Sequence, residues 1–234
     1  MATQNKVVTK DQWIEARKKL LAKEKEFTRL RDELSQRRRE LPWEAVGEAY
    51  VFEGRDGKQT LAELFDGRSQ LVVYHFMFGP DWDAGCPHCS RWADNFNSII
   101  VHLNQRDVTM IAVSRAPFRK LAAYAKRMGW NFKWVSSAGN KFNFDYHVSF
   151  TEEENAKKRA FYNFTVQDPG ISEREGISVF FKDSKGRIFH TYSTYARGID
   201  MLSLDYHYLD LVPKGRNEGN RGPFWVRRHD EYGR

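Results

Sequence analysis

One nearly continuous apolar segment, residues 71–78 (LVVYHFMF), constrains the fold of this chain more than any other feature. Its side chains do not alternate between apolar and polar, so the segment predicts a strand covered on both faces, as in sheets that lie between layers of helices. A loop follows, and Pro87 then occupies a favoured first position of a helix. That helix has one apolar face, formed by Trp92, Phe96, Ile99, Ile100 and Leu103. The sequence therefore predicts a strand–loop–helix unit.

The central region continues this alternation of strands and helices. Residues 108–114 predict a second buried strand, and residues 118–128 predict a helix that Gly129 can end. Two further strands, at 177–182 and 187–194, have the pattern of a β-hairpin. A last helix is expected over about 199–211. Together these elements predict an α/β fold in which helices flank a mixed sheet on both faces.

The N-terminal region predicts a long helix from about residue 10 to residue 40. Apolar side chains recur in it every seven positions: Trp13, Leu20, Phe27, Leu34 and Leu41. Polar residues interrupt the second row of this heptad, so we expect either a strap packed on the domain or an arm for a homodimer, rather than a full coiled coil. We expect a helical extension over residues 1–42, one domain over 43–213 and a partly ordered tail over 214–234.

The chain carries 38 Lys and Arg against 31 Asp and Glu, a formal charge of +7. Much of the excess lies in the N-terminal extension and the tail, so we favour solvated charged faces over a nucleic-acid surface. No stretch approaches the roughly 18 apolar residues of a membrane span, and the N-terminus lacks the apolar core of a secretion signal. We therefore expect a cytoplasmic protein without a membrane partner.

The only two cysteines lie in one tetrapeptide, Cys86-Pro87-His88-Cys89, at the predicted start of a helix. The N–H groups and the positive end of the helix lower the pKa of a thiol placed there, so Cys86 is the expected nucleophile. Three-residue spacing puts Cys89 on the same side, where it can resolve a mixed disulfide. His88 would further stabilise the thiolate when protonated.

The cysteine pair could also have a role without redox chemistry, in either of two ways. It could supply half of a zinc or iron site, but the remaining ligands would have to come from histidines elsewhere, since there is no second cysteine pair. It could also be an inert structural pair. No glycine-rich phosphate loop follows a predicted strand. We therefore expect neither a metal ion nor a cofactor.

Several residues near the tetrapeptide could support its chemistry. Trp82 could act as a lid over the thiol or be a half-buried surface side chain. Asp83 or Asp94 could transfer protons, although such carboxylates are usually only solvated. Arg115 follows the second strand at the sheet edge where α/β proteins bind ligands; it could attract an anionic group, lower the thiol pKa, or form a salt bridge. His75, within a strand, fits a hydrogen-bonded core histidine best.

The sequence resembles the thioredoxin superfamily and, more closely, a bacterial family of thioredoxin-like proteins, domain of unknown function 899 (DUF899). This likeness spans most of the chain and rests on four segments, residues 74–78, 85–89, 113–117 and 190–198. The family is described as predicted dithiol/disulfide oxidoreductases. The resemblance therefore implies a thioredoxin-like fold and the same redox chemistry at Cys86 and Cys89.

The strand, cysteine loop and helix are also similar to the alkyl-hydroperoxide-reductase branch of peroxiredoxins. Peroxidases of that branch carry a Thr three residues before the reactive Cys and a Pro four residues before that Thr; here Asp83 and Gly79 stand in those places. Thioredoxins carry a cis-proline just before the hairpin strand, where this chain has Glu175-Gly176-Ile177-Ser178. That difference favours a small-molecule or non-catalytic role over binding of an extended protein substrate.

Three functions follow from these patterns. The first is a thiol–disulfide oxidoreductase acting on a protein or small-molecule thiol or disulfide. The second is a thiol peroxidase that acts through a sulfenic acid at Cys86. The third is a non-catalytic thioredoxin-like binding module whose working surface is the basic helical arm. The substrate, the electron donor, the direction of electron flow and the oligomeric state are not encoded in any pattern of the sequence.

Overall fold

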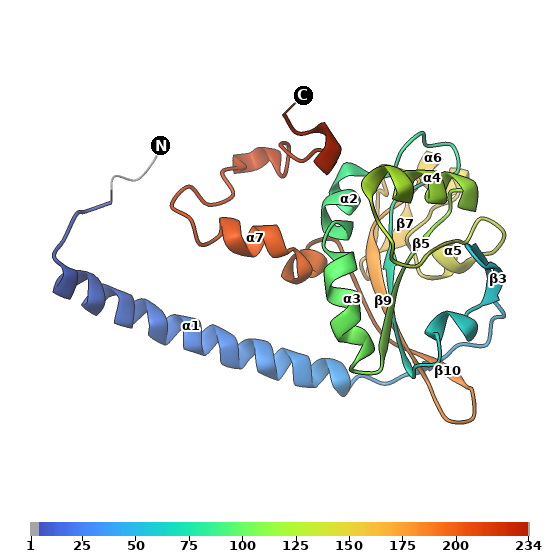
Figure 1. Ribbon diagram of the computed structural model, residues 1–234, viewed down its shortest axis with the longest axis horizontal. Coiled ribbons are helices and arrows are strands. Elements are labelled where there is room, and N and C mark those ends of the chain that lie inside the picture. Colours follow the sequence, from blue (N-terminus) through green and yellow to red (C-terminus); the bar gives the residue numbers. More distant parts are fainter. Residues whose placement is uncertain (1–4, 234) are drawn as a thin grey trace. The chain divides into compact units, whose positions relative to one another are not determined.

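The computed structural model describes residues 5–233, and the chain separates into two compact units, one ending at Pro42 and one beginning at Trp43. The first unit contains the helix α1 (Lys10–Arg39), so the predicted long helix is present (Figure 1). Thr9 begins it with a capping box shared with Gln12. None of its side chains is buried within the chain. A strap and a dimerisation arm both stay predictions.

The second unit is built on an eight-stranded mixed sheet with the order β1-β10-β9-β4-β5-β6-β2-β3. Strands β4, β5 and β6 are parallel, and β9 runs antiparallel to β4. The strands of this sheet are β1 (Glu44–Ala45), β2 (Val51–Gly54), β3 (Gly57–Thr60), β4 (Gln70–His75), β5 (Val108–Ser114), β6 (Trp134–Ser136), β9 (Gly176–Lys182) and β10 (Ile188–Tyr195).

Two apolar clusters lie on opposite faces of this sheet. Leu71 and Val73 of β4 belong to one cluster, whereas Val72 and Tyr74, between and after them, pack with the other. The Tyr74 face is covered by α2 (Pro87–Ala93), α3 (Phe96–Asn104) and α4 (Phe118–Met128); the opposite face is covered by η1 (Glu63–Phe65) and α5 (Phe142–Asp145). The predicted arrangement is confirmed: an α/β fold in which helices flank a mixed sheet on both faces (Figure 1).

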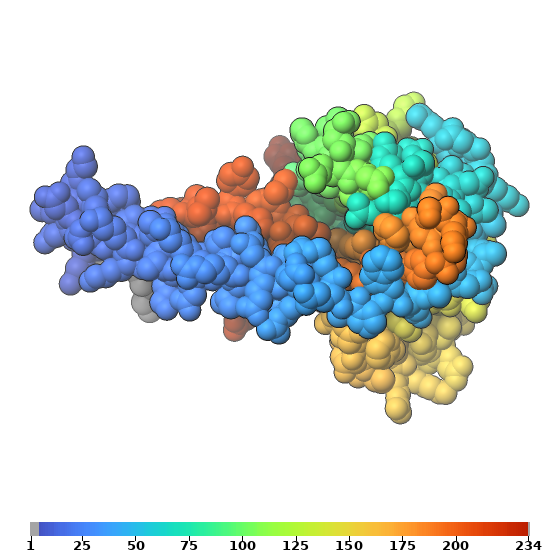
Figure 2. Space-filling view, turned by 90° about the horizontal axis from the view of Figure 1, so that it is seen from below, coloured from blue at the N-terminus to red at the C-terminus, as the bar shows by residue number. Residues whose placement is uncertain are grey.

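A smaller third cluster lies beyond the end of the sheet. It packs Val148, Phe150 and Tyr162 around a hairpin that is separate from the main sheet. Figure 2 shows the segment that contains this hairpin, in yellow and pale orange, as a lobe on the surface of the domain. The elements of this region are α6 (Glu152–Ala156), β7 (Ala160–Tyr162) and β8 (Thr165–Gln167).

Two helices differ from their sequence-based expectation. The apolar face after Pro87 predicts one helix, but the chain breaks it between α2 and α3, where Asp94 accepts a hydrogen bond from Trp130 Nε1 at 2.9 Å. The expected last helix is a 3₁₀ segment, η2 (Ala196–Leu202), followed by α7 (Leu204–Leu209). Ser203 separates them and accepts from Trp92 Nε1 at 2.6 Å. Both breaks fall at side chains with distant partners, which local periodicity does not report.

The tail from residue 214 onward contains two short 3₁₀ turns, η3 (Gly219–Arg221) and η4 (His229–Glu231). That this tail is only partly ordered stays a prediction, as do the domain boundaries. None of the helices described within residues 5–233 combines the length and apolar character needed to cross a membrane.

Gly176 is the first residue of β9 and lies opposite His75 of β4. It offers a test of the packing at this end of the strand. A Cβ at this position would lie 2.7 Å from the Tyr195 ring and 3.0 Å from Val148 Cγ1, too close for either. Gly176→Ala should lower the free energy of unfolding by about 1–3 kcal/mol in urea denaturation, as overpacking does. Gly139→Ala, whose Cβ would meet nothing within 4 Å, should change it little. Equal losses in the two variants would contradict this packing.

Candidate active site

The two cysteines lie at the first turn of α2, directly after the loop that leaves β4. Cys86 is the residue before the helix, and Pro87 is its first residue. The Cys86 N–H donates to the carbonyl of Met77 at 3.0 Å, and the Cys86 carbonyl accepts from Ser90 N at 3.0 Å, the first helical hydrogen bond. Cys86 is half-buried and Cys89 is fully buried. The predicted position of the pair at a helix start is therefore the observed one.

The surroundings of the two thiols shift their pKa values in opposite directions. The pKa of Cys86 is lowered from 9.0 to about 7, first by a hydrogen bond from the Cys89 thiol and then by the backbone N–H groups of Cys89 and His88. Burial and the carboxylate of Glu175 oppose this shift. Burial raises the pKa of Cys89, and its hydrogen bond to Cys86 raises it further. Cys86 is therefore the thiolate of the pair and Cys89 the thiol.

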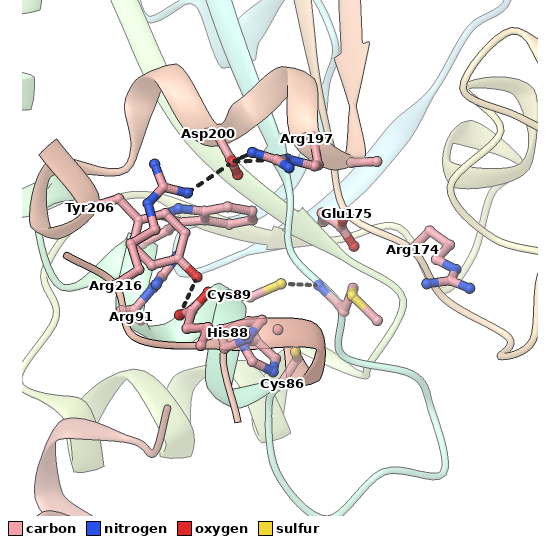
Figure 3. A pocket seen from close by; sticks show the side chains of 17 residues that line it. Cys86, His88, Cys89, Arg91, Arg174, Glu175, Arg197, Asp200, Tyr206 and Arg216 are labelled. Atoms are coloured by element: carbon pink, nitrogen blue, oxygen red, sulfur yellow. Dashed lines mark hydrogen bonds and ion pairs between the residues drawn. The ribbon is translucent and has the colours of Figure 1, made fainter. Parts of the chain in front are cut away.

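The Cys89 sulfur accepts a hydrogen bond from the segment that follows β4. Met77 N–H donates to Cys89 Sγ at 3.4 Å (Figure 3). The hydroxyl of Tyr74 is fully buried near the same sulfur. Within the described chain, no atom lies in the position of a hydrogen-bond partner to this hydroxyl. Burial raises the pKa of Tyr74 well above its usual value, so the group stays a neutral donor. A thiolate formed at Cys89 during exchange would find this donor beside it.

His88 contributes through its backbone rather than its ring. Partial desolvation and the nearby Arg91 both lower the pKa of the His88 imidazole. The protonated form, on which the predicted support of the thiolate depends, is therefore disfavoured near neutral pH. The His88 N–H, in contrast, is among the groups that lower the pKa of Cys86.

Three other residues were expected to support the cysteines. Trp82 is partly buried against the core, with its ring close to Gly79, and Asp83 is exposed. Arg115 forms an ion pair of 2.9 Å with the buried Glu173. None of the three lines the pocket beside the cysteines. Among the alternatives given for Arg115, the salt bridge is the one observed.

Two further candidates have structural partners. Asp94 accepts hydrogen bonds from Trp130 and from His229 Nδ1, the latter at 2.7 Å. His75 is fully buried and lies 2.9 Å from the hydroxyl of Ser178. Burial lowers the pKa of His75 to about 3, with His190 adding to the shift, so it is a neutral core histidine. Between residues 5 and 233, no three His, Cys, Asp or Glu side chains gather so as to hold a metal ion.

A pocket of about 660 Å³ opens beside the dithiol (Figure 3). The first turn of α2 forms one wall, and the segment that leads into β9 forms another. The remaining walls come from η2, α7 and the tail. Tyr206 is the lining residue from α7, and the other segments supply charged side chains: Arg91, Arg174, Glu175, Arg197, Asp200, Arg216 and Glu218.

Sequence reasoning did not assign a role to any of these charged residues. Two signals were available. Glu175 lies in the segment that replaces the cis-proline of thioredoxins, and Arg197 lies in a segment that carries the family resemblance. No cis peptide bond occurs in the described chain. The residues of η2 and the tail come to the site only through the tertiary fold.

The tail also holds the backbone that precedes Cys86. Arg228 donates from Nη2 to the carbonyl of Gly85 at 2.8 Å and from Nε to the hydroxyl of Tyr124 at 2.8 Å. Tyr124 lies 2.9 Å from Ser90 Oγ, which in turn donates to the Cys86 carbonyl. The Arg228 guanidinium therefore fixes the carbonyl groups on both sides of Cys86, one directly and one through two side chains.

The sequence matches a known protein family over almost its whole length. A family model described as "Bacterial protein of unknown function (DUF899)" matches residues 2–232. No curated protein matches the sequence.

Solved structures with a similar arrangement are distant in sequence. A mutant of peroxiredoxin Q from Xanthomonas campestris has 14% identity and a TM-score of 0.46, over 70% of this chain and 98% of that one. Peroxidoxin BcpB from Mycobacterium tuberculosis has 12% identity and a TM-score of 0.43, over 69% and 95%. A mitochondrial 1-Cys peroxiredoxin from yeast has 17% and 0.44, over 73% and 78%. Similarity of this order does not bear on the activity of this chain.

The thiol pKa values predict how alkylation of Cys86 depends on pH. Because only the thiolate reacts, the rate with iodoacetamide should rise through a midpoint near pH 7 and fall away below it. Cys89→Ala removes the hydrogen-bond donor and should move the midpoint upward. Cys89→Ser keeps a donor and should move it less. A midpoint that Cys89→Ala leaves unchanged would contradict the assigned cause.

Docking of the tail can be tested with two neighbouring arginines. Arg228→Gln removes hydrogen bonds to Gly85 and Tyr124 and should lower the free energy of unfolding by about 1–3 kcal/mol in urea denaturation. Arg227 Nη1 donates only to carbonyls within the tail, those of Phe224 and Val226. Arg227→Gln should therefore cost less than about 1 kcal/mol. Equal effects would show that the tail is not held as described.

Proposed function

Since the chain belongs to the DUF899 family of bacterial proteins, whose activity is unknown, we propose from its site that it is a thiol–disulfide oxidoreductase. In this proposal Cys86 is the attacking thiolate and Cys89 is the resolving thiol. The observation that carries it is the placement of both thiols in the first turn of one helix, beside an open pocket, where their surroundings shift their pKa values in opposite directions.

The reaction exchanges one disulfide for another. The Cys86 thiolate attacks one sulfur of a substrate disulfide RSSR, forming a Cys86–SR mixed disulfide and releasing RS⁻. Cys89 then loses its proton to solvent and attacks Cys86 Sγ. This step forms the Cys86–Cys89 disulfide and releases the second RS⁻. The substrate is reduced by two electrons and the protein dithiol is oxidised by two; the reverse sequence oxidises a substrate dithiol.

The difference between the two pKa values suits this order of events. With its pKa near 7, about half of Cys86 is thiolate at neutral pH, near the optimum for an attacking thiol. Cys89 remains protonated until a mixed disulfide has formed at Cys86. In the mixed disulfide the Cys86 sulfur carries no negative charge, so the ionisation of Cys89 becomes easier. Met77 N–H and the Tyr74 hydroxyl are the donors available to the new thiolate.

A second class of reaction, peroxide reduction through a Cys86 sulfenic acid, uses the same thiolate. It finds less support, because Asp83 and Gly79 stand where peroxidases of the related branch carry their Thr and Pro. A third possibility is a binding module that uses neither sulfur. Both make predictions that differ from those of disulfide exchange.

The proposal is tested with three cysteine variants in an insulin-reduction assay and in exchange with small disulfides. Wild-type protein should form one intramolecular disulfide reversibly. Cys86→Ser should lose all exchange, whereas Cys89→Ser should accumulate a mixed disulfide that mass spectrometry detects. The double variant sets the background of each assay. A wild-type dithiol that reacts with disulfides no faster than free cysteine would refute the proposal.

The same proteins separate the other two functions. Stopped-flow mixing with a hydroperoxide should oxidise Cys86 no faster than free cysteine if disulfide exchange is the activity. A rate far above that of free cysteine would favour the peroxidase. Partner capture that is sensitive to salt and unaffected by both Cys→Ser changes would favour the binding module.

A further inference from the structure

Most charges in the pocket beside the dithiol neutralise one another. Arg91 lies 3.3 Å from a carboxylate oxygen of Asp205. Arg197 and Arg216 both pair with Asp200, at 3.2 and 3.4 Å (Figure 3). Arg216 also pairs with a second aspartate at 2.8 Å and stacks on the Tyr206 ring. These arginines shape the walls of the pocket and have little charge left for a ligand.

Three other charged groups of the pocket have no ion pair within the described residues. The Arg174 guanidinium donates to one backbone carbonyl, that of Pro169, and reaches no carboxylate. The Glu175 carboxylate accepts only a long hydrogen bond, 3.4 Å, from the Tyr162 hydroxyl. Glu218 accepts from two neutral donors, at 2.9 and 2.7 Å, and from no cation. The pocket therefore presents one uncompensated positive charge and two uncompensated negative charges.

These groups line the same pocket as the two sulfur atoms. Figure 3 shows Glu175 over the dithiol, with Arg174 farther out on the same side. Glu175 opposes ionisation of both cysteines and of Tyr74, which places its carboxylate near all three. Glu218, from the tail, lines the same pocket. A molecule in contact with Cys86 is thus within reach of charges of both signs.

Charges in a cleft are favourable when a ligand supplies their partners, since the lower dielectric strengthens each pair. The volume of about 660 Å³ is in the range of pockets for small molecules. An extended protein segment would have to pass between walls formed by η2 and the tail. A compact ligand with an ammonium and a carboxylate group fits both the size and the charges.

We infer that this pocket binds small amino-acid or short-peptide thiols and disulfides that carry both an ammonium and a carboxylate group. Glu175, together with Glu218, receives the ammonium, and Arg174 receives the carboxylate, while the substrate sulfur faces Cys86. This assignment rests on the proposed disulfide exchange and names its substrate class. The overall step is protein dithiol plus RSSR giving protein disulfide plus two RSH, so no further reductant takes part.

A series of four disulfides tests the assignment in single-turnover reactions of the fully reduced protein. Cystine carries both charges, cystamine only ammonium groups, dithiodiglycolate only carboxylates, and hydroxyethyl disulfide no charge. Each second-order rate constant is divided by that of free dithiothreitol with the same disulfide, which removes differences in intrinsic reactivity. The corrected rate for cystine should exceed that for hydroxyethyl disulfide about tenfold or more, as charge-assisted hydrogen bonds allow.

Two variants assign the charges separately. Glu175→Gln should reduce the preference for cystamine over the neutral disulfide, and Arg174→Gln should reduce the preference for dithiodiglycolate. Because each preference is a ratio measured on one protein, a general change in the thiol pKa values leaves it unchanged. Glu152→Gln and Arg159→Gln are matched controls, since both residues are exposed and lie outside the pocket.

The outcomes separate the inference from the proposed function. Equal corrected rates for all four disulfides would overturn the substrate class and leave disulfide exchange standing. Failure to react with any of them, with no Cys86–Cys89 disulfide formed, would overturn both. The wild-type series alone decides the substrate class, so the test does not depend on the folding of either variant.

Discussion

The proposed chemistry of this protein depends on one interaction at the first turn of α2, that of the Cys89 thiol with the ionised Cys86 sulfur. It is the largest cause of the lowered pKa of Cys86, ahead of the backbone N–H groups of the helix start. Cys89 is fully buried and Cys86 only half-buried, so ionisation costs more free energy at Cys89 than at Cys86. Two identical side chains thereby have their pKa values shifted in opposite directions, which suits the different parts that the proposal gives them.

Several distant segments hold this interaction in place. The end of the buried strand supplies Met77, whose carbonyl accepts from Cys86 N and whose N–H donates to Cys89 Sγ. The tail supplies Arg228, which binds the carbonyl of Gly85. The segment before β9 supplies Glu175, whose carboxylate raises the pKa of both thiols. In our proposal the same carboxylate binds the ammonium group of the substrate. The site is thus a property of the whole domain, although its reactive atoms lie in four consecutive residues.

The sequence predicted what local patterns encode. The apolar run of residues 71–78 indicated a buried strand, which the structure forms as β4 and ends at His75. Pro87 marked the start of the helix that carries the cysteines, and Gly129 ends α4 with a positive φ. Other features depend on contacts between segments far apart in the chain, which no periodicity reports. The pairing of Arg115 with Glu173, the break at Asp94, and the walls formed by η2 and the tail are of this kind. The role expected of the His88 ring depends on contacts of the same kind, since desolvation and the nearby Arg91 lower its pKa.

The most direct test of this account is equilibration of the protein in glutathione buffers of graded redox poise, with the Cys86–Cys89 disulfide quantified by mass after acid quenching. The account predicts one reversible two-electron transition between dithiol and intramolecular disulfide, with a midpoint that defines the direction in which the protein works. A dithiol that stays reduced throughout, or that stops at glutathione adducts without closing the disulfide, would contradict it.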